Sequence, residues 1–336
     1  MIFMEILLCY DRSLQRGKEP WKNFTVLDLT KPMIPDISYL ILNYNPEGEE
    51  NARRILGETI DAFYARKSKR LRCEVFLLDQ GSPDFHRRWI LEQQDRYGFS
   101  SVFLSQNIGI SGAINWLART AKAPVIGLVT SDVIITTGMD EDLFQKVQIG
   151  EVFQATPFTD KSDVGYQIWI PGEDFGSSDV DLTALANRED SWVENLVNGR
   201  NRGYIRAIGV ELNVMFWRKD VFQRIGYFDE RWKACYENND FSLRCFLAGG
   251  CTAVSKGSFV WHVHKVTEKN GSRDRCFREF GSAWPQKLRQ MWDEKWPNLE
   301  NLINLYKPLK EKTISDYPRL RETFQHNIRL PFSTVG

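Results

Sequence analysis

Three groups of polar residues combine the side-chain types and the spacing that metal binding or acid–base chemistry requires. Asp132 follows a run of apolar residues, and a carboxylate at the end of a buried strand is costly unless water, a partner or a cation neutralises its charge. Glu237 and Asp240 are spaced to lie on one face of a helix, where a carboxylate can serve as a general base. His262 and His264 alternate along an expected strand and therefore point to one face, as two ligands of one metal ion would.

Each of these groups also has a purely structural interpretation. Asp132 can be an ordinary loop residue, and Asp240 can form an i, i+4 ion pair with Arg244 that only stabilises the helix. Two histidines on a strand can be satisfied without any ligand. Asp79, which ends another apolar run, can accept a hydrogen bond from a ligand or initiate the turn at QGSP. The residues alone leave these alternatives open.

A fourth candidate is the start of an expected helix. Asn107 and Gly109 precede Ser111 and Gly112, and the backbone N–H groups of such a helix start can bind an anion. The structural alternative is an ordinary cap followed by a tight turn.

The elements that must position these residues alternate between strand and helix. Short apolar runs predict strands, and apolar residues at helical spacing predict the helices between them. The expected strands cover 37–42, 73–79, 101–105 and 124–129, and the expected helices cover 50–66, 84–97 and a segment containing residues 113, 114, 117 and 121. This order predicts a parallel α/β sheet, whose ligands bind beyond the carboxyl ends of the strands. The polar segments NYN, DQGS, QNIG and TSDV all fall at those ends.

The second half of the chain has a less regular pattern. Residues 150–205 are rich in Gly, Asp and Ser around a short expected helix near 190–198. Strand signals return at 211–217 and 260–264, with a helix expected over 237–247. From about residue 284 the spacing of Trp and Leu predicts a helical segment.

Composition excludes several classes of protein. The 336 residues contain 44 Lys and Arg against 44 Asp and Glu, so no net charge favours binding to nucleic acid. No apolar stretch approaches the roughly 18 residues of a membrane span, and the opening segment lacks the pattern of a signal peptide. The six cysteines lack CxxC spacing, which indicates reduced thiols and a cytoplasmic protein.

In their order along the chain, five segments resemble the motifs of the family 2 inverting glycosyltransferases. These segments are LILNYN (40–45), EVFLLDQGSPD (74–84), the stretch from SQNIG to MDEDL (105–143), GYFDERWKACYENNDFSLR (226–244) and FVWHVH (259–264). The resemblance covers roughly residues 37–265. It implies an α/β protein of GT-A type: a Rossmann-like, mostly parallel sheet flanked by helices, with a helical C-terminal extension.

The resemblance also implies how the chain is divided. We expect an N-terminal extension over 1–36 and a GT-A catalytic domain over 37–268. Within that domain, 37–135 would be the nucleotide-sugar half and 136–268 the acceptor half. A helical C-terminal tail would cover 269–336.

The resemblance implies that the protein is a sugar transferase. Its donor would be a nucleotide diphosphate sugar (a UDP, GDP or dTDP sugar), and its acceptor a glycan, a lipid-linked acceptor or a protein. By resemblance, the residues that contact the nucleoside, ribose or diphosphate are Asn43, Tyr44, Asp79, Asn107, Gly109 and Asp132. Asp132 and His262 would hold Mn²⁺ or Mg²⁺ on the diphosphate, where a cation stabilises the charge of the leaving group. Glu237 would deprotonate the acceptor hydroxyl, and Asp240 is the second carboxylate of that block.

Two positions depart from the family pattern. Ser131 stands where the metal-binding triplet usually has another acidic residue, and Asn238 stands at the position often assigned to the base. These departures keep a second hypothesis open, namely a non-catalytic carbohydrate or nucleotide-sugar binding module of the same fold. A dinucleotide oxidoreductase is disfavoured, because GISG is only a fragment of its glycine-rich motif.

Overall fold

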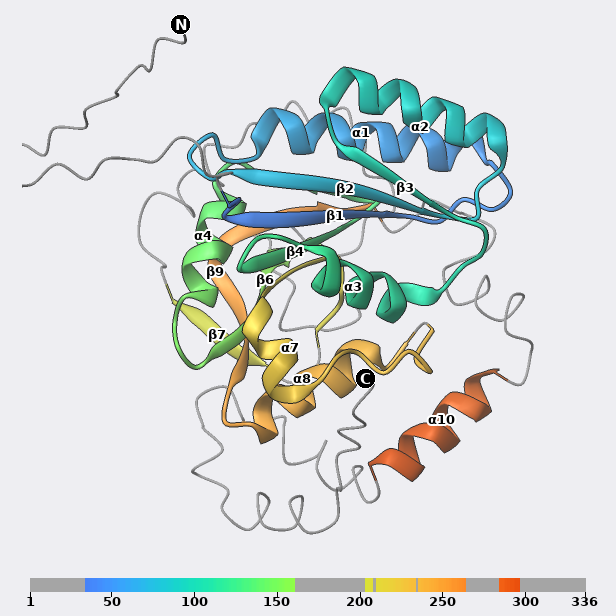
Figure 1. Cartoon of the computed structure of the whole chain (residues 1–336). Helices are drawn as coiled ribbons and strands as arrows, with labels where there is room; N and C mark the ends of the chain where they lie inside the picture. Colours follow the sequence, from blue (N-terminus) through green and yellow to red (C-terminus); the bar gives the residue numbers. More distant parts are fainter. Residues whose placement is uncertain (1–33, 161–202, 208–209, 234, 264–283, 297–336) are drawn as a thin grey trace, which may run out of the picture. The chain divides into compact units, whose positions relative to one another are not determined.

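The computed structural model describes residues 34–160, 203–207, 210–233, 235–263 and 284–296 (Figure 1). Its strands are β1 (Ile37–Asn43), β2 (Cys73–Gln80), β3 (Ser100–Leu104), β4 (Val125–Thr130), β5 (Val133–Ile135), β6 (Val152–Thr159), β7 (Tyr204–Ala207), β8 (Val214–Arg218) and β9 (Cys251–His262). Its helices are α1 (Glu50–Arg66), α2 (Asp84–Tyr97), α3 (Gly109–Thr120), α4 (Met139–Val147), α7 (Lys219–Ile225), α8 (Glu237–Leu247) and α10 (Trp284–Lys295).

The described strands form one nine-stranded sheet in the order β3-β2-β1-β4-β8-β6-β9-β5, with β7 paired to β9. The first four strands in this order are parallel, as the alternation of strands and helices predicts. Their register pairs Asn43 with Asp79 and Leu42 with Thr130. The polar residues that end β1, β2 and β4 therefore share one edge of the sheet.

The other half of the sheet is mixed. Strand β8 runs antiparallel to β4 and β6, while β9 is parallel to β6 and antiparallel to β5 and β7. A pattern of strand, helix and strand predicts parallel pairing only where one helix joins consecutive strands. Strand β8 reaches β4 from a distant part of the chain, so the local pattern does not set its direction.

The two faces of the sheet carry separate hydrophobic cores. Helices α1 and α2 lie on one side and α3, α7 and α8 on the other (Figure 1). The first core packs Tyr39 of β1 edge-on against Phe63 of α1 and Phe216 of β8. The second contains Trp217 of β8 and Phe241 of α8. Burial on both faces explains why β1 is apolar along almost its whole length.

Helix bounds agree closely with the sequence pattern. Helices α1, α2 and α8 occupy the predicted ranges 50–66, 84–97 and 237–247. The strand expected at 260–264 is the end of the longer β9, and the strand expected at 211–217 begins at Val214. The helix expected near 190–198 lies outside the described residues. Of the tail 269–336, the structure describes only residues 284–296, which contain α10.

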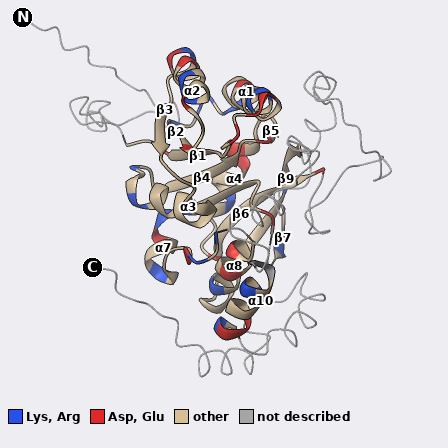
Figure 2. Ribbon diagram, turned by 90° about the vertical axis from the view of Figure 1, so that its right-hand side faces the viewer, with Lys and Arg blue, Asp and Glu red and all other residues tan. Residues whose placement is uncertain are grey.

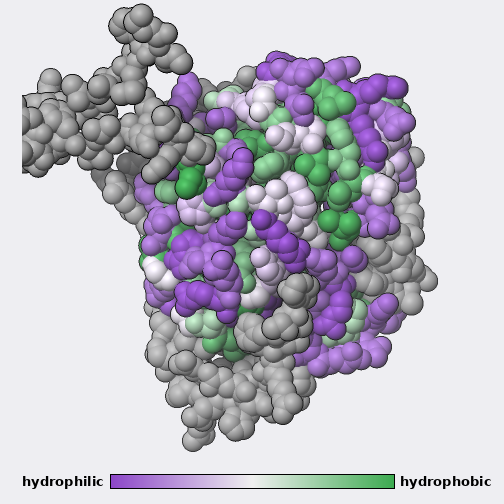
Figure 3. Space-filling model, viewed as in Figure 1, coloured by the Kyte–Doolittle hydropathy of each residue, from purple (hydrophilic) through white to green (hydrophobic). Residues whose placement is uncertain are grey.

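The described surface carries charges of both signs. Figure 2 shows Lys and Arg interspersed with Asp and Glu on α1, α2 and α10. The face drawn in Figure 3 likewise mixes hydrophilic and hydrophobic residues. Among the described helices, none has both the length and the hydropathy to cross a bilayer.

Candidate functional site

The carboxyl ends of β1 and β2 bring two predicted nucleoside-binding residues together. Asn43 Nδ2 donates a hydrogen bond of 2.7 Å to Asp79 Oδ1, and both side chains are buried. Tyr44 follows Asn43 and is half-buried. The structure thus joins Asn43 and Asp79 in one polar cluster at the edge where ligands of such sheets bind.

The Asp79 carboxylate forms the turn after β2. Its Oδ2 accepts the backbone N–H of Ser82 at 3.2 Å, and its Oδ1 accepts the Ser82 hydroxyl. Arg87 Nε lies 3.6 Å from Asp79 Oδ2. The turn-forming interpretation of Asp79 therefore describes this structure. Ser82 was not among the predicted site residues, although an Asp followed by Gly-Ser is a recognisable turn signal.

His86 is a buried member of the same cluster that the sequence analysis missed. Its Nε2 lies 3.1 Å from Asn43 Nδ2, and its ring stacks on Trp89. Because an amide nitrogen can only donate, Nε2 accepts and the imidazole carries its proton on Nδ1. Burial lowers the pKa of His86, which is consistent with a neutral ring. One histidine on an amphipathic helix gives no sequence signal for such a contact.

Two backbone N–H groups at the start of α3 already donate hydrogen bonds to side chains of the protein. The side chain of Asn107 accepts the Gly109 N–H at 2.7 Å, and Gln80 Oε1 accepts the Ile108 N–H at 3.0 Å. Gly109 has a φ of +79°, and a Cβ at this position would lie 2.7 Å from Lys233 O. Glycine is required here for both reasons. In this structure the Asn107 side chain closes a turn before α3, and Gly109 lets the 229–233 loop approach closely.

Asp132 and His262, the two predicted metal ligands, lie next to each other at the sheet edge. Antiparallel pairing sets Val133 opposite His262, and Val263 N donates to Asp132 O at 2.8 Å. Asp132 Oδ2 then lies 3.4 Å from His262 Nε2, while Asp132 Oδ1 accepts the Thr130 hydroxyl at 2.8 Å. His264 lies outside the described residues.

Two further carboxylates surround His262. Glu211 Oε1 lies 3.8 Å from His262 Nδ1, and Asp160 Oδ1 accepts the His262 backbone N–H at 2.7 Å. Burial disfavours the charged imidazole, but Asp132, Glu211 and Asp160 outweigh it and raise the pKa of His262 to about 9. Glu211 and Asp160 were not among the predicted site residues, because neither lies within the five segments that resemble the family motifs.

The facing atoms of Asp132 and His262 are spaced for a divalent cation, which would have to displace the proton that a pKa of about 9 keeps on the imidazole at neutral pH. Two ligands at right angles on an ion with bonds of about 2.1 Å lie about 3 Å apart, close to the observed 3.4 Å. A carboxylate oxygen and an imidazole nitrogen are both suitable ligands of Mn²⁺. Among the residues that the structure describes, no group of three or more His, Cys, Asp or Glu side chains is arranged to hold a metal ion. An ion here would therefore need further ligands from the substrate or water.

Glu237 is the first residue of α8 and is almost fully buried. Burial raises the pKa of Glu237 to about 7. Its Oε2 makes no hydrogen bond to any described residue. The preceding residues Cys235 and Tyr236 have φ angles of 69° and 66°, in the left-handed region that residues other than glycine seldom adopt. A strained turn therefore presents a buried carboxylate whose pKa suits proton transfer near neutral pH.

Asp240, the second predicted carboxylate, is engaged on both oxygens. Arg244 donates to its Oδ2 at 3.1 Å, which is the expected i, i+4 pair. Its Oδ1 accepts the Trp296 indole N–H at 2.9 Å and lies 2.8 Å from Lys295 Nζ. The side chain is fully buried. Lys295 and Trp296 were not predicted, because residues so far apart in the sequence give no local signal of contact.

A mixed α/β sheet with a parallel half, flanked by helices, has the GT-A fold of glycosyltransferases. Residues 42–221 match the family model of glycosyl transferase family 2, which is more than half of the chain. The chain therefore belongs to glycosyl transferase family 2. Among curated protein sequences, none matches it.

Several solved glycosyltransferase structures are similar to this chain. The structure of GalNAc-T7 with UDP, GalNAc and Mn²⁺ has a TM-score of 0.50 and 13% identity, and covers 74% of this chain and 47% of that one. TarS 1–349 of S. aureus with UDP-GlcNAc has a TM-score of 0.45 and 12% identity, covering 67% of this chain and 58% of that one. The mannosyltransferase PcManGT from Pyrobaculum calidifontis, with GDP-Man and Mn²⁺, has a TM-score of 0.45 and 13% identity, covering 70% and 61%. This chain spans less than two thirds of each of them.

Proposed function

We propose that this protein transfers a sugar from a nucleotide diphosphate sugar to an acceptor hydroxyl, with inversion at the anomeric carbon and assistance from a divalent cation. The observation that carries the proposal is the Asp132–His262 pair, whose facing atoms are 3.4 Å apart at the edge of the sheet. Membership of glycosyl transferase family 2 supplies the class of reaction. The acceptor would be a glycan, a lipid-linked sugar or a protein.

Asp132 and His262 would hold Mn²⁺ or Mg²⁺ against the diphosphate of the donor. When bound, the cation stabilises the negative charge that develops on the leaving diphosphate. Ser131 supplies no carboxylate, so the diphosphate oxygens would complete the coordination together with water. GalNAc-T7 was solved with UDP, GalNAc and Mn²⁺, so a UDP sugar is the first donor to test, before GDP and dTDP sugars.

Glu237 would act as the general base toward the acceptor hydroxyl. Its buried carboxylate has an oxygen without a hydrogen bond to any described residue, so that oxygen is available to accept a proton. A pKa of about 7 keeps a large fraction ionised at neutral pH while leaving the group basic enough to work. Attack from the face opposite the leaving diphosphate would invert the anomeric carbon. Asn238 cannot take this role, because an amide has no basic site in this pH range.

Asn43, Tyr44 and Asp79 would line the nucleoside side of the site. Asn43 ends β1, Tyr44 follows it, and Asp79 lies near the end of β2, at the edge that the parallel strands share. Asn107 and Gly109 would form the adjacent wall toward the ribose and diphosphate. A cytoplasmic location is part of this proposal, and among the described cysteines Cys73, Cys245 and Cys251 are free thiols.

A donor panel tests this proposal directly. Purified protein is mixed with UDP, GDP and dTDP sugars, with and without Mn²⁺, and both the melting temperature and the release of nucleoside diphosphate are measured. A specific donor should raise the melting temperature only with the cation, since ligands that bind the native state stabilise it. Failure of every sugar nucleotide to bind, in the presence of either Mn²⁺ or Mg²⁺, would overturn the proposal.

A non-catalytic binding module of the same fold is the second candidate. Ser131 and Asn238, which replace acidic residues of the family pattern, favour it. It predicts donor binding without turnover on any acceptor, including water. Slow release of nucleoside diphosphate that disappears in Glu237→Gln would exclude this candidate, because a binding module has no use for a base.

A further inference from the structure

One face of α10 is attached to the first turn of α8 through buried polar contacts. Lys295 Nζ lies 2.8 Å from both Asp240 Oδ1 and Asp229 Oδ2. The Trp296 indole N–H donates to Asp240 Oδ1 at 2.9 Å, and this side chain is fully buried. Asp240 is one helical turn after Glu237, so these contacts hold the turn that carries the candidate base.

Aromatic contacts continue this attachment to the strained residue before α8. The ring of Trp292 lies 5.0 Å from the ring of Tyr236 and 6.1 Å from that of Trp232, measured between centroids. Tyr236 is the N-cap of α8 and has a φ of +66°. A left-handed conformation at such a residue persists only when surrounding contacts enforce it. Trp292 is one of the contacts that enclose this ring.

The opposite end of the same network reaches the start of α3. Lys295 forms an ion pair with Asp229, the first residue of the 229–233 loop. In the same loop, Trp232 O accepts a 2.8 Å hydrogen bond from Ser111 Oγ of α3. Lys233 O occupies the space where a side chain on Gly109 would lie. Helix α10 is therefore connected both to the candidate base and to the wall of the nucleotide side.

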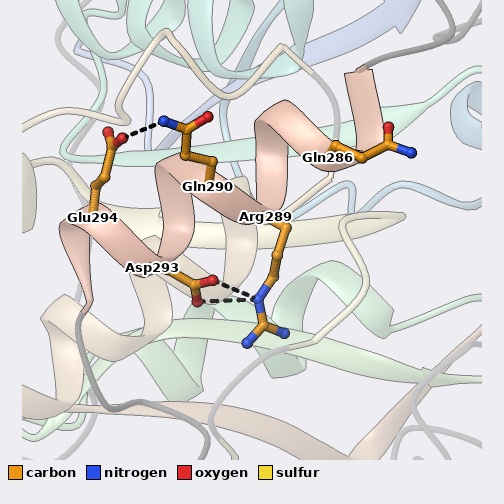
Figure 4. A pocket seen from close by; sticks show the side chains of 5 residues that line it. All are labelled: Gln286, Arg289, Gln290, Asp293 and Glu294. Carbon is orange, nitrogen blue, oxygen red and sulfur yellow. Dashed lines mark hydrogen bonds and ion pairs between the residues drawn. The ribbon is translucent and has the colours of Figure 1, made fainter.

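The exposed face of α10 makes no such attachment to the described residues of α8. Figure 4 shows this face, with Arg289 paired to Asp293 and Gln290 hydrogen-bonded to Glu294 within the helix. Arg289 is about half exposed. Two cationic residues of one helix, Arg289 and Lys295, thus differ in whether they reach α8, which provides a matched pair for experiment.

We propose that Lys295 and Trp296 are positioning residues that fix the first turn of α8, and with it the Glu237 carboxylate, by binding Asp240 and the 229–233 loop. This inference rests on the proposed function, in which Glu237 is the base. Asp240 transmits the restraint and does not itself exchange a proton with substrate, since its oxygens are occupied by Arg244, Lys295 and Trp296.

Positioning by α10 has a consequence for acid–base behaviour. Glu237 is buried, and this burial is the main cause of its raised pKa. No described charged side chain forms an ion pair with Glu237, so access of water is what would change its pKa. Loosening the first turn of α8 would admit water and move the pKa back toward the ordinary value of 4.5. A purely structural role of α10 would change the amount of folded protein and leave this pKa in place.

The test compares Trp296→Phe and Lys295→Met with Arg289→Met in the full chain. Phenylalanine keeps most of the buried ring but removes the indole N–H, and methionine keeps the length of the lysine stem without its charge. Deuterium uptake at residues 237–241 should increase in the first two variants and not in Arg289→Met. Turnover should fall at least about fivefold with the donor KM unchanged within about twofold, as expected for a displaced catalytic group. The acid limb of the pH–rate profile should move from about pH 7 to roughly pH 6.

Each outcome decides between the possibilities. Unchanged deuterium uptake at 237–241 in both variants overturns the attachment. Increased uptake with unchanged turnover and an unchanged pH profile overturns the positioning role. If wild-type protein turns over no donor, the proposed function fails by that result alone, and the uptake comparison still decides whether α10 restrains α8. Phe63→Leu, a change in the core beneath α1, serves as the control for a general loss of stability.

Discussion

The Asp132 carboxylate and the His262 imidazole face each other across an antiparallel pair of strands, with Oδ2 and Nε2 3.4 Å apart. The two residues are 130 positions apart in the chain, and register alone brings them together, because Val133 of β5 pairs with His262 of β9. Thr130 orients the other oxygen of Asp132. A pair fixed by backbone pairing on both sides is preorganised for a ligand between or beside its two atoms.

Replacing Asp132 by Asn should abolish metal-dependent donor binding while the fold remains intact. The side chain is about a quarter exposed at the end of a strand, so the amide can be solvated there, but it lacks the charge that a divalent cation requires. Calorimetry with donor and Mn²⁺ measures the change. Asp220→Asn, an exposed aspartate beside Arg218, is the control and should bind as the wild type does. Equal affinity in the two variants would remove Asp132 from the site.

Replacing Glu237 by Gln should leave donor affinity unchanged and lower turnover by about 10²-fold or more, the usual contribution of a general base. In the wild type, turnover should rise with pH and level off above about pH 7, because the base must be deprotonated and its pKa is about 7. Initial rates at saturating donor between pH 5 and 9 give the profile. Glu294→Gln on the exposed face of α10 should keep both the rate and the profile. Normal turnover in Glu237→Gln would assign the base elsewhere.

The same substitution should stabilise the protein at alkaline pH. The folded-state pKa of Glu237 is raised to about 7 from 4.5, so its burial favours the protonated form. The stability that the protonated side chain provides is complete below pH 4.5 and is lost as pH rises through about 7. Glutamine resembles the protonated acid at every pH. Glu237→Gln should therefore gain on the order of 2 kcal/mol relative to wild type at pH 8 and little at pH 4.5. Urea denaturation at the two pH values checks this, and an equal difference at both would contradict the assigned pKa.

The helices and the parallel half of the sheet could be predicted because their signals are local. The apolar residues of 50–66 recur at helical spacing, and α1 occupies that range. The direction of β8 and the contact of Glu211 with His262 could not be predicted, because both depend on how distant segments pair. Lys295 and Trp296 illustrate the same limit, since nothing near residue 240 in the sequence indicates that α10 will bind Asp240.

Some features of the candidate site could be predicted from the sequence, and others could not. Juxtaposition of Asp132 and His262 followed from the family resemblance, and the structure brings the two together. Asp79 and Asp240 have the geometry of the structural alternatives, a turn and an ion pair, which the residues had left open. Residue type alone does not distinguish a carboxylate that awaits a ligand from one that the fold has already satisfied. Only the partners and the burial of Asp79 and Asp240 make that distinction.

Replacing Asp240 by Asn should destabilise the protein by roughly 2–4 kcal/mol, because it leaves Arg244 and Lys295 beside a neutral group in a buried position. The amide oxygen can still accept the Trp296 N–H, so the fold should persist at low temperature. Thermal or urea denaturation gives the magnitude. Asp293→Asn, which breaks the exposed i, i+4 pair with Arg289, should cost less than about 0.5 kcal/mol. A loss of stability as small as that of the control would show that the buried network contributes little.

Replacing Gly109 by Ala should be far more costly than the same change at Gly98, although the two glycines have nearly the same φ, +79° and +77°. At Gly98 an added Cβ meets no atom within 4 Å, so the change should cost only the strain of a left-handed alanine, about 1 kcal/mol. At Gly109 the Cβ would lie 2.7 Å from Lys233 O, a backbone atom of the 229–233 loop that cannot rotate away. The loop would have to move from the start of α3, and we expect a total loss of about 2–4 kcal/mol. Urea denaturation of the two variants isolates the contact from the conformational strain, and equal losses would show that the loop moves freely.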